Sequence, residues 1–234
     1  MIEKSNNDEA RWAILEAVRQ NLAKSAPFDK AHREHHAQSG KPATANAPLV
    51  SSAELQNVSL IERFRENLVS IGGNCSVVSS TQKAAQAVRT IIENVKVRHI
   101  AVSDAPLVEK TVEFLNTDAE FLTNASAAAL FECDVGITSA QWAIAETGTL
   151  VLESEKEFNR LTSLVPPVHI CLLEAKRMRQ TLGEILLILN ADGRENLSRT
   201  VTFITGPSRT SDIELTLAIG VHGPAELHAI VIDE

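Results

Sequence analysis

Apolar positions along the chain from residue 51 onward recur at two spacings. Stretches with apolar residues three and four apart are typical of amphipathic helices, and short β-favouring runs between them indicate strands. Strands and helices alternate, which predicts a mostly parallel sheet flanked by helices, an α/β fold. The predicted helices are 51–68, 84–95, 107–115 and 175–189, and the predicted strands are 75–78, 98–103, 134–138, 149–152, 168–173, 201–205 and 227–232.

The N-terminal part follows a different pattern and is predicted to be separate from this domain. Residues 8–24 have apolar positions at helical spacing and indicate an amphipathic helix. Residues 25–50 are rich in proline and polar residues, which indicates a flexible arm. The histidine cluster at 32–36 is interpreted as solvated rather than metal-binding. We therefore expect an N-terminal helical arm over residues 1–50 and an α/β domain over 51–234.

Composition narrows the classes of partner. Apolar residues make up 44% of the chain but aromatic residues only 4%, so the core is expected to be aliphatic, as in a buried parallel sheet. The formal net charge of −8 is opposite in sign to the basic surface expected of a nucleic-acid binder. The sequence has no uncharged apolar run long enough for a membrane span and starts with polar residues instead of a signal segment. We therefore expect a cytoplasmic protein.

The three cysteines are Cys75, Cys133 and Cys171, each isolated in an apolar stretch. Such cysteines are most simply reduced core residues. The sequence contains no Cys-x-x-Cys pair that would hold zinc or an iron–sulfur cluster. We expect no metal and no cofactor in this chain.

In parallel sheets ligands bind along the carboxyl ends of the strands, so polar residues there are the first candidates. Thr138 follows a strand, and Thr138-x-x-Gln141 has the form of a capping box that opens a short helix. Glu146-Thr147-Gly148 then turns the chain into the next strand. Glu146 is a candidate nucleophile or general base, with Thr138, Thr147 and Gly148 as ligand contacts. The alternative is that Glu146 binds backbone amides or a nearby arginine.

A second candidate turn spans residues 205–212, where Gly206-Pro207 reverses the chain after an apolar strand. Its hydroxyls, guanidinium and exposed backbone suit a phosphate or carboxylate. The alternative is structural: Ser211-x-x-Glu214 is itself a capping box, and Arg209 can pair with a neighbouring carboxylate. The candidate ligand-binding residues of this turn are Gly206, Ser208, Arg209 and Thr210.

The remaining candidates are two histidines and an arginine. His222 lies between glycines in the turn 220–224 and is a candidate acid/base group, although a lone histidine in a turn is more often structural. Arg160 is a second cationic candidate for the same sheet edge. His169 lies within an apolar strand and is expected to be hydrogen-bonded and partly buried.

Five runs of residues together resemble the lactate-utilization protein C family, which is built on the LUD domain. The resemblance implies a fold similar to the sugar-isomerase and CoA-transferase-like superfamily. It also implies a role in oxidising L-lactate to pyruvate beside iron–sulfur partner proteins that would hold the clusters. One difference is Asn159, where family members often have glycine. The five runs are 134–138, 143–149, 160–170, 204–214 and 220–224.

Three hypotheses follow. In the first, the chain is a non-redox subunit or accessory protein of L-lactate oxidation that binds a small anionic ligand. In the second, it is a stand-alone enzyme with Glu146 as nucleophile or base, acting on an anionic acyl, phosphate or nucleotide substrate. In the third, it is a regulatory or scaffold protein that docks through residues 25–50. The resemblance places the first hypothesis ahead of the others.

Overall fold

The computed structural model describes residues 15–16, 59–95, 97–157, 159–191, 198–210 and 218–234. The chain divides into two units, residues 1–56 and 57–234. In the first unit Leu15 and Glu16 are helical, and the rest of the predicted helix 8–24 and arm 25–50 lies outside the described residues.

The second unit is built on a six-stranded sheet in which every pair of neighbouring strands is parallel, which confirms the predicted α/β fold. Its central strands, β4 and β7, are buried along nearly their whole length, as their continuous apolar runs require. The order across the sheet is β1 (Asn74–Val78), β12 (Glu226–Ile232), β7 (Val168–Glu174), β4 (Val135–Ser139), β2 (His99–Val102) and β3 (Glu120–Thr123).

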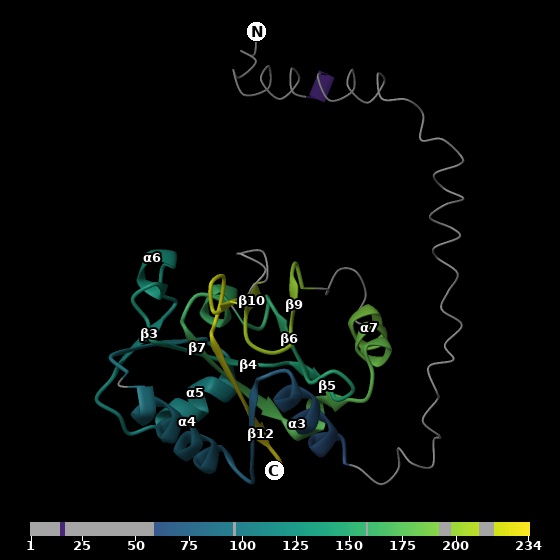
Figure 1. Cartoon of the computed structure of the whole chain (residues 1–234), viewed down its shortest axis with the longest axis horizontal. Helices are drawn as coiled ribbons and strands as arrows, with labels where there is room; N and C mark the ends of the chain where they lie inside the picture. Colours follow the sequence, from purple (N-terminus) through teal and green to yellow (C-terminus); the bar gives the residue numbers. More distant parts are fainter. Residues whose placement is uncertain (1–14, 17–58, 96, 158, 192–197, 211–217) are drawn as a thin grey trace. The chain divides into compact units, whose positions relative to one another are not determined.

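The two faces of this sheet are covered differently. Helices α4 (Thr81–Val95) and α5 (Pro106–Glu113) pack on the face that carries Ile170 and Leu172 of β7. The alternate residues of β7, Cys171 and Leu173, point to the opposite face. There they pack against helix α3 (Leu60–Ser70) and a second sheet (Figure 1). The short helix α6 (Ala127–Leu130), which sequence reasoning missed, packs beside β2.

The second sheet has four strands and was not predicted as a separate layer. Strands β5 and β6 pair antiparallel, as do β6 and β9, whereas β5 and β8 are parallel. Helix α7 (Leu182–Ala191) packs on its outer face through Ile185 and Leu189. The strands in order are β8 (Met178–Arg179), β5 (Trp142–Ile144), β6 (Thr149–Glu153) and β9 (Val201–Ile204). A third, two-stranded sheet pairs β10 (Arg209–Thr210) with β11 (Ala218–Ile219).

The predicted continuous helix 175–189 is wrong. A short 3-10 helix, η2 (Ala175–Arg177), leads into β8, and only then does α7 begin. Tertiary contacts explain the break, because the guanidinium groups of Arg177 and Arg179 lie 5.2 and 5.0 Å from the Trp142 ring centre. Thr181 and Glu184 form the capping box at the new helix start.

The first helix of the domain also starts later than predicted. Ser59 has an extended backbone and its side chain accepts a hydrogen bond from the Glu62 amide, so it caps α3. The predicted helix therefore does not run unbroken from Ser51, and residues 51–58 lie outside the described part of the chain.

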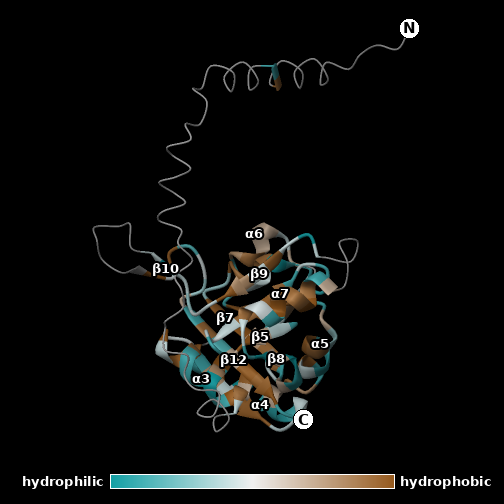
Figure 2. Cartoon of the chain, turned by 90° about the vertical axis from the view of Figure 1, so that its right-hand side faces the viewer, coloured by the Kyte–Doolittle hydropathy of each residue, from teal (hydrophilic) through white to brown (hydrophobic). Residues whose placement is uncertain are grey.

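Helix α7 is largely apolar (Figure 2), and several of its leucine side chains are exposed. Leu187 is 72% exposed and Leu186 is 52% exposed, while the inward positions are buried.

No helix within the described ranges is long and apolar enough to cross a membrane.

A close backbone approach at Gly136 supports the central strand. A Cβ at this position would lie 2.0 Å from the carbonyl oxygen of Thr162, in the 3-10 helix η1 (Arg160–Ser163).

We predict that Gly136→Ala lowers the free energy of unfolding by about 1–3 kcal/mol, since overpacking forces the backbone apart. Urea titration followed by circular dichroism measures this. Gly183→Ala in α7 is the control, because its nearest atom would be 3.8 Å away, and it should lose no stability. Equal losses in both variants would contradict the prediction.

Candidate functional site

Two hollows lie at opposite ends of β7. The first, here called the amino-end pocket, has a volume of about 240 Å³ and lies where β7 and β12 begin, beside His169 and Leu227. Three predicted site residues line it: Gly206, Ser208 and His222. The sequence placed these residues at the carboxyl edge of the parallel sheet. That placement is wrong, because β9, which leads into Gly206, belongs to the second sheet.

Two turns are joined to form the wall of this pocket. The amide of Ser208 donates to the carbonyl of Pro224 at 2.9 Å, and the amide of Gly220 donates to the carbonyl of Ser208 at 3.0 Å. Gly206 has φ +85° and packs against Ile71, a conformation that favours glycine. These contacts hold Ser208 and His222 on the same hollow, although fourteen positions separate them in the chain.

His169 is the buried member of the pocket. A hydrogen bond of 2.8 Å joins its Nε2 to Oγ1 of Thr138, and its Nδ1 has no partner among the described residues. Burial, with a smaller contribution from nearby His228, lowers the pKa of His169 to about 3. The imidazole is therefore neutral at neutral pH. Thr138 lies behind His169 and is buried, and it opens no helix, since β4 continues through it to Ser139.

The polar side chains around the amino-end pocket carry hydroxyl and imidazole groups. Hydroxyls of Ser163, Thr202, Thr205 and Ser208 line it together with the two histidines, and no carboxylate is among the described residues that line it. Hydroxyl and imidazole N–H groups suit a small anion, whose oxygens accept hydrogen bonds. This is the geometric basis for a ligand site here.

The Glu146-Thr147-Gly148 turn lies away from the pocket and is held by neighbouring helices. Glu146 Oε1 accepts a hydrogen bond from the Leu182 amide at the start of α7, at 2.9 Å, which is the backbone-amide alternative given above. A Cβ on Gly148, which has φ +63°, would lie 2.4 Å from the Leu68 nitrogen. Thr147 shares a 2.7 Å hydrogen bond with Thr149, which in turn shares one of 2.8 Å with the pocket residue Thr205.

The predicted cations also lie outside the pocket's described lining. Arg209 donates from Nη2 to the carbonyl of Ile71 at the end of α3, and Thr210 belongs to β10. Arg160 is exposed on η1, where Asn159 caps the turn by accepting from the Leu161 amide at 3.2 Å. The structure thus brings Gly206, Ser208 and His222 together and leaves the cations apart from them.

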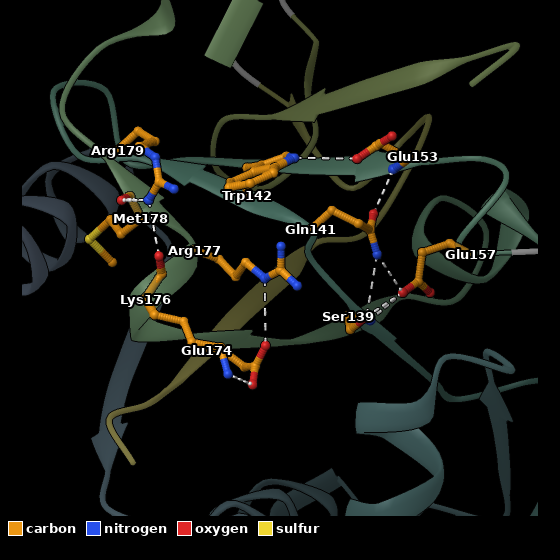
Figure 3. A network of polar contacts seen from close by, with 10 residues as sticks. All are labelled: Ser139, Gln141, Trp142, Glu153, Glu157, Glu174, Lys176, Arg177, Met178 and Arg179. Carbon is orange, nitrogen blue, oxygen red and sulfur yellow. Dashed lines mark hydrogen bonds and ion pairs between the residues drawn. The ribbon is translucent and has the colours of Figure 1, made fainter. Parts of the chain in front are cut away.

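Sequence reasoning missed a buried carboxyl at the other end of the sheet, Glu157, which is 1% exposed. Its Oε1 accepts from the Ser139 amide at 3.0 Å, from the Ser139 hydroxyl at 2.5 Å and from Nε2 of Gln141 at 3.2 Å (Figure 3). Its Oε2 has no partner among the described residues. Burial raises the pKa of Glu157, and the surrounding hydroxyl, amide and backbone donors offset this only in part. No local pattern signals this burial, because Glu157 ends a charged run that also includes Glu153 and Glu155.

A comparison with known proteins places these features in context. A family model described as "LUD domain" matches residues 61–232. The "Uncharacterized protein NMB1437" of Neisseria meningitidis is 34% identical over 159 residues, which span 63% of this chain and 62% of that protein. "Lactate utilization protein C" of Deinococcus radiodurans is 29% identical over 199 residues, 85% of this chain and 91% of that protein.

A further relative and a solved structure agree with these matches. "Lactate utilization protein C" of Bacillus subtilis is 33% identical over 105 residues, 44% of each protein. The crystal structure of a DUF162 family protein from Deinococcus radiodurans is similar with a TM-score of 0.58 and 25% identity, and the match covers 74% of this chain and 96% of that one.

The raised pKa of Glu157 predicts how stability depends on pH. The folded protein binds this proton more tightly than the unfolded chain, so the stabilisation is complete below the ordinary value of 4.5 and is lost as pH rises through the raised pKa. We predict that this loss, about 1.4 kcal/mol for each unit of elevation, disappears in Glu157→Gln. Melting temperatures from pH 4 to 8 test this.

The matched control is Glu155→Gln, which removes an exposed charge two residues earlier. Its melting profile should follow that of the wild type in shape. If the Glu157→Gln profile also followed the wild type, Glu157 would not be the group responsible.

Proposed function

The chain belongs to the LUD domain family, and from that premise we propose that it is a non-redox subunit in the oxidation of L-lactate to pyruvate, acting with iron–sulfur partner proteins. The observation that carries this proposal is the match to "Lactate utilization protein C" of Deinococcus radiodurans, which spans 91% of that protein. A match over nearly the whole length of a relative supports a shared role more strongly than a match to one segment.

The chemistry of the cysteines supports placing the clusters in partner proteins. Cys75 lies on β1, Cys133 just before β4, and Cys171 on β7, so they come from separate parts of the fold. Burial raises the pKa of Cys75 to about 11 and raises that of Cys171 as well. Iron is bound by thiolates, which such thiols supply poorly. All three are free thiols, which accords with a reducing cytoplasmic setting.

The small ligand of this proposal is lactate or pyruvate, held in the amino-end pocket. A volume of about 240 Å³ accommodates a three-carbon acid, and the lining hydroxyls supply donors for its carboxylate. His169 is neutral, so it adds a hydrogen-bonding group without a charge. To His222, which lines the pocket and is exposed, we assign the exchange of a proton with the ligand's hydroxyl or carbonyl oxygen.

The pathway role predicts a growth phenotype. Deletion of the gene should abolish growth on L-lactate as sole carbon source while growth on pyruvate continues, because only the oxidation step is lost. Growth curves measure this, and tagged wild-type protein from lactate-grown cells should co-purify with iron-containing proteins. Normal growth of the deletion strain on L-lactate, in the absence of a paralogue, would contradict the pathway role.

Ligand binding in the pocket predicts thermal stabilisation by L-lactate or pyruvate. A ligand at one hundred times its Kd stabilises the folded state by about 2.7 kcal/mol. We expect Ser208→Ala and His222→Ala to lose most of this shift, because both side chains line the pocket. Differential scanning fluorimetry at a series of ligand concentrations measures it.

The variant Arg209→Ala distinguishes ligand binding in the pocket from ligand binding at the neighbouring turn. Arg209 does not line the pocket within the described residues, so this variant should melt lower without ligand yet keep the ligand-dependent shift. If the shift were lost in Arg209→Ala and retained in His222→Ala, the anion would bind at the turn and not in the pocket.

A further inference from the structure

The strand order of the parallel sheet contains a point at which its direction of growth reverses. After β2 the chain crosses through α5 to β3 on one side, whereas after β4 it continues to β7 on the other side. The neighbouring strands β2 and β4 therefore send their connections in opposite directions. In open parallel sheets a crevice forms outside the carboxyl ends of two such strands, and ligands bind there. This position is distinct from the amino-end pocket.

A cleft occupies this position. Its volume is about 560 Å³, more than twice that of the amino-end pocket, and within the range of small-molecule sites. Asp104 enters it from the turn after β2, Ser139 from the end of β4, and Glu174 from the end of β7. His169 and Glu174 are five residues apart on β7, so the two hollows are separated by about 17 Å along the strand.

The polar groups behind this cleft have unused hydrogen-bonding capacity. Ser103 Oγ and Glu157 Oε2 are both buried and neither makes a hydrogen bond of good geometry among the described residues, although the Ser103 hydroxyl lies near enough to Glu157 to lower the pKa of its carboxyl. Unpaired buried polar atoms are uncommon in native structures and call for an explanation such as an active role or a bound molecule. Each lies one residue from a residue that lines the cleft, since Ser103 precedes Asp104 and Glu157 follows Lys156.

The walls of the cleft carry charges of both signs. Arg177 and Lys156 supply two cations, while Asp104, Glu155 and Glu174 supply three carboxylates. Arg177 is held over the Trp142 ring, and its Nε is 3.6 Å from Glu174, a long contact that leaves the pair loosely joined (Figure 3). The N-terminus of α5, capped by Ala105 without a side-chain hydrogen bond, also faces this cleft through Pro106 and Leu107.

This combination selects for a ligand with two kinds of group. A purely anionic ligand would be repelled by the three carboxylates, and a purely cationic one by Arg177 and Lys156. Carboxylates accept hydrogen bonds from hydroxyls, whereas guanidinium groups and helix N-termini bind phosphate or carboxylate. A molecule with hydroxyl groups and one anionic group satisfies both.

We propose that the cleft at the carboxyl ends of β2, β4 and β7 is a second ligand site, for a hydroxylated anion of nucleotide size. Arg177 binds the anionic group, beside the N-terminus of α5. Asp104 and Glu174 accept hydrogen bonds from the hydroxyls, and Ser139, held by Glu157, forms the polar floor.

The probe for this site is AMP, which combines a phosphate with ribose hydroxyls. Isothermal titration calorimetry gives its affinity beside those of adenosine and inorganic phosphate, each of which carries only one of the two groups. We expect AMP to bind at least tenfold more tightly than either, since charge-assisted and neutral hydrogen bonds then add. In a Trp12→Phe background Trp142 is the remaining tryptophan, so AMP that contacts Arg177 should change its fluorescence.

Two arginine residues provide a matched pair of variants. Arg177→Ala should weaken AMP binding about tenfold or more, whereas Arg89→Ala, which removes the same charge from an exposed residue of α4 outside the described cleft lining, should leave it unchanged. Asp104→Asn should weaken AMP binding but not phosphate binding. Absence of AMP binding, equal affinity for phosphate and AMP, or equal loss in Arg177→Ala and Arg89→Ala would overturn the proposal.

Discussion

The rest of the structure depends on the burial of β4 and β7 in the middle of the parallel sheet. A strand covered on both faces has no place for an unpaired polar side chain, so each polar residue in it requires a specific partner. Thr138 finds His169 on the neighbouring strand, and Ser139 finds Glu157 from the connection that follows β6. The first pair lies at the amino-end pocket, and the second lies at the cleft at the carboxyl ends of β2, β4 and β7.

The regular part of the fold could be predicted because local patterns determine it. Each strand of the parallel sheet except β3 stands out as an apolar run, and turn residues mark its ends. The second sheet could not be predicted in the same way, since β5 and β8 contain only three and two residues and pair across a long stretch of sequence. Likewise, residues 175–189 have a helical pattern that the contacts of Arg177 and Arg179 with Trp142 override.

The residues of the candidate site could likewise be predicted only in part. Gly206, Ser208 and His222 could be nominated from the sequence because glycine and proline mark the turns that carry them, yet nothing local revealed that the two turns meet. Glu157 could not be nominated at all. Its neighbours Glu155 and Lys156 are exposed, and it is buried only because Ser139 and Gln141, from another part of the chain, supply its hydrogen bonds.

The arrangement of the two hollows bears on whether they act together. Thr138 and Ser139 are consecutive residues of β4, and one contacts a residue of the pocket while the other lines the cleft. Coupling between sites requires an element with two arrangements that both ligands bias. Strand β4 is paired on both sides, with β2 and β7, and packs into the core, which holds it in one register. A central strand of this kind separates the two hollows, so each is set by the residues at its own end of the sheet.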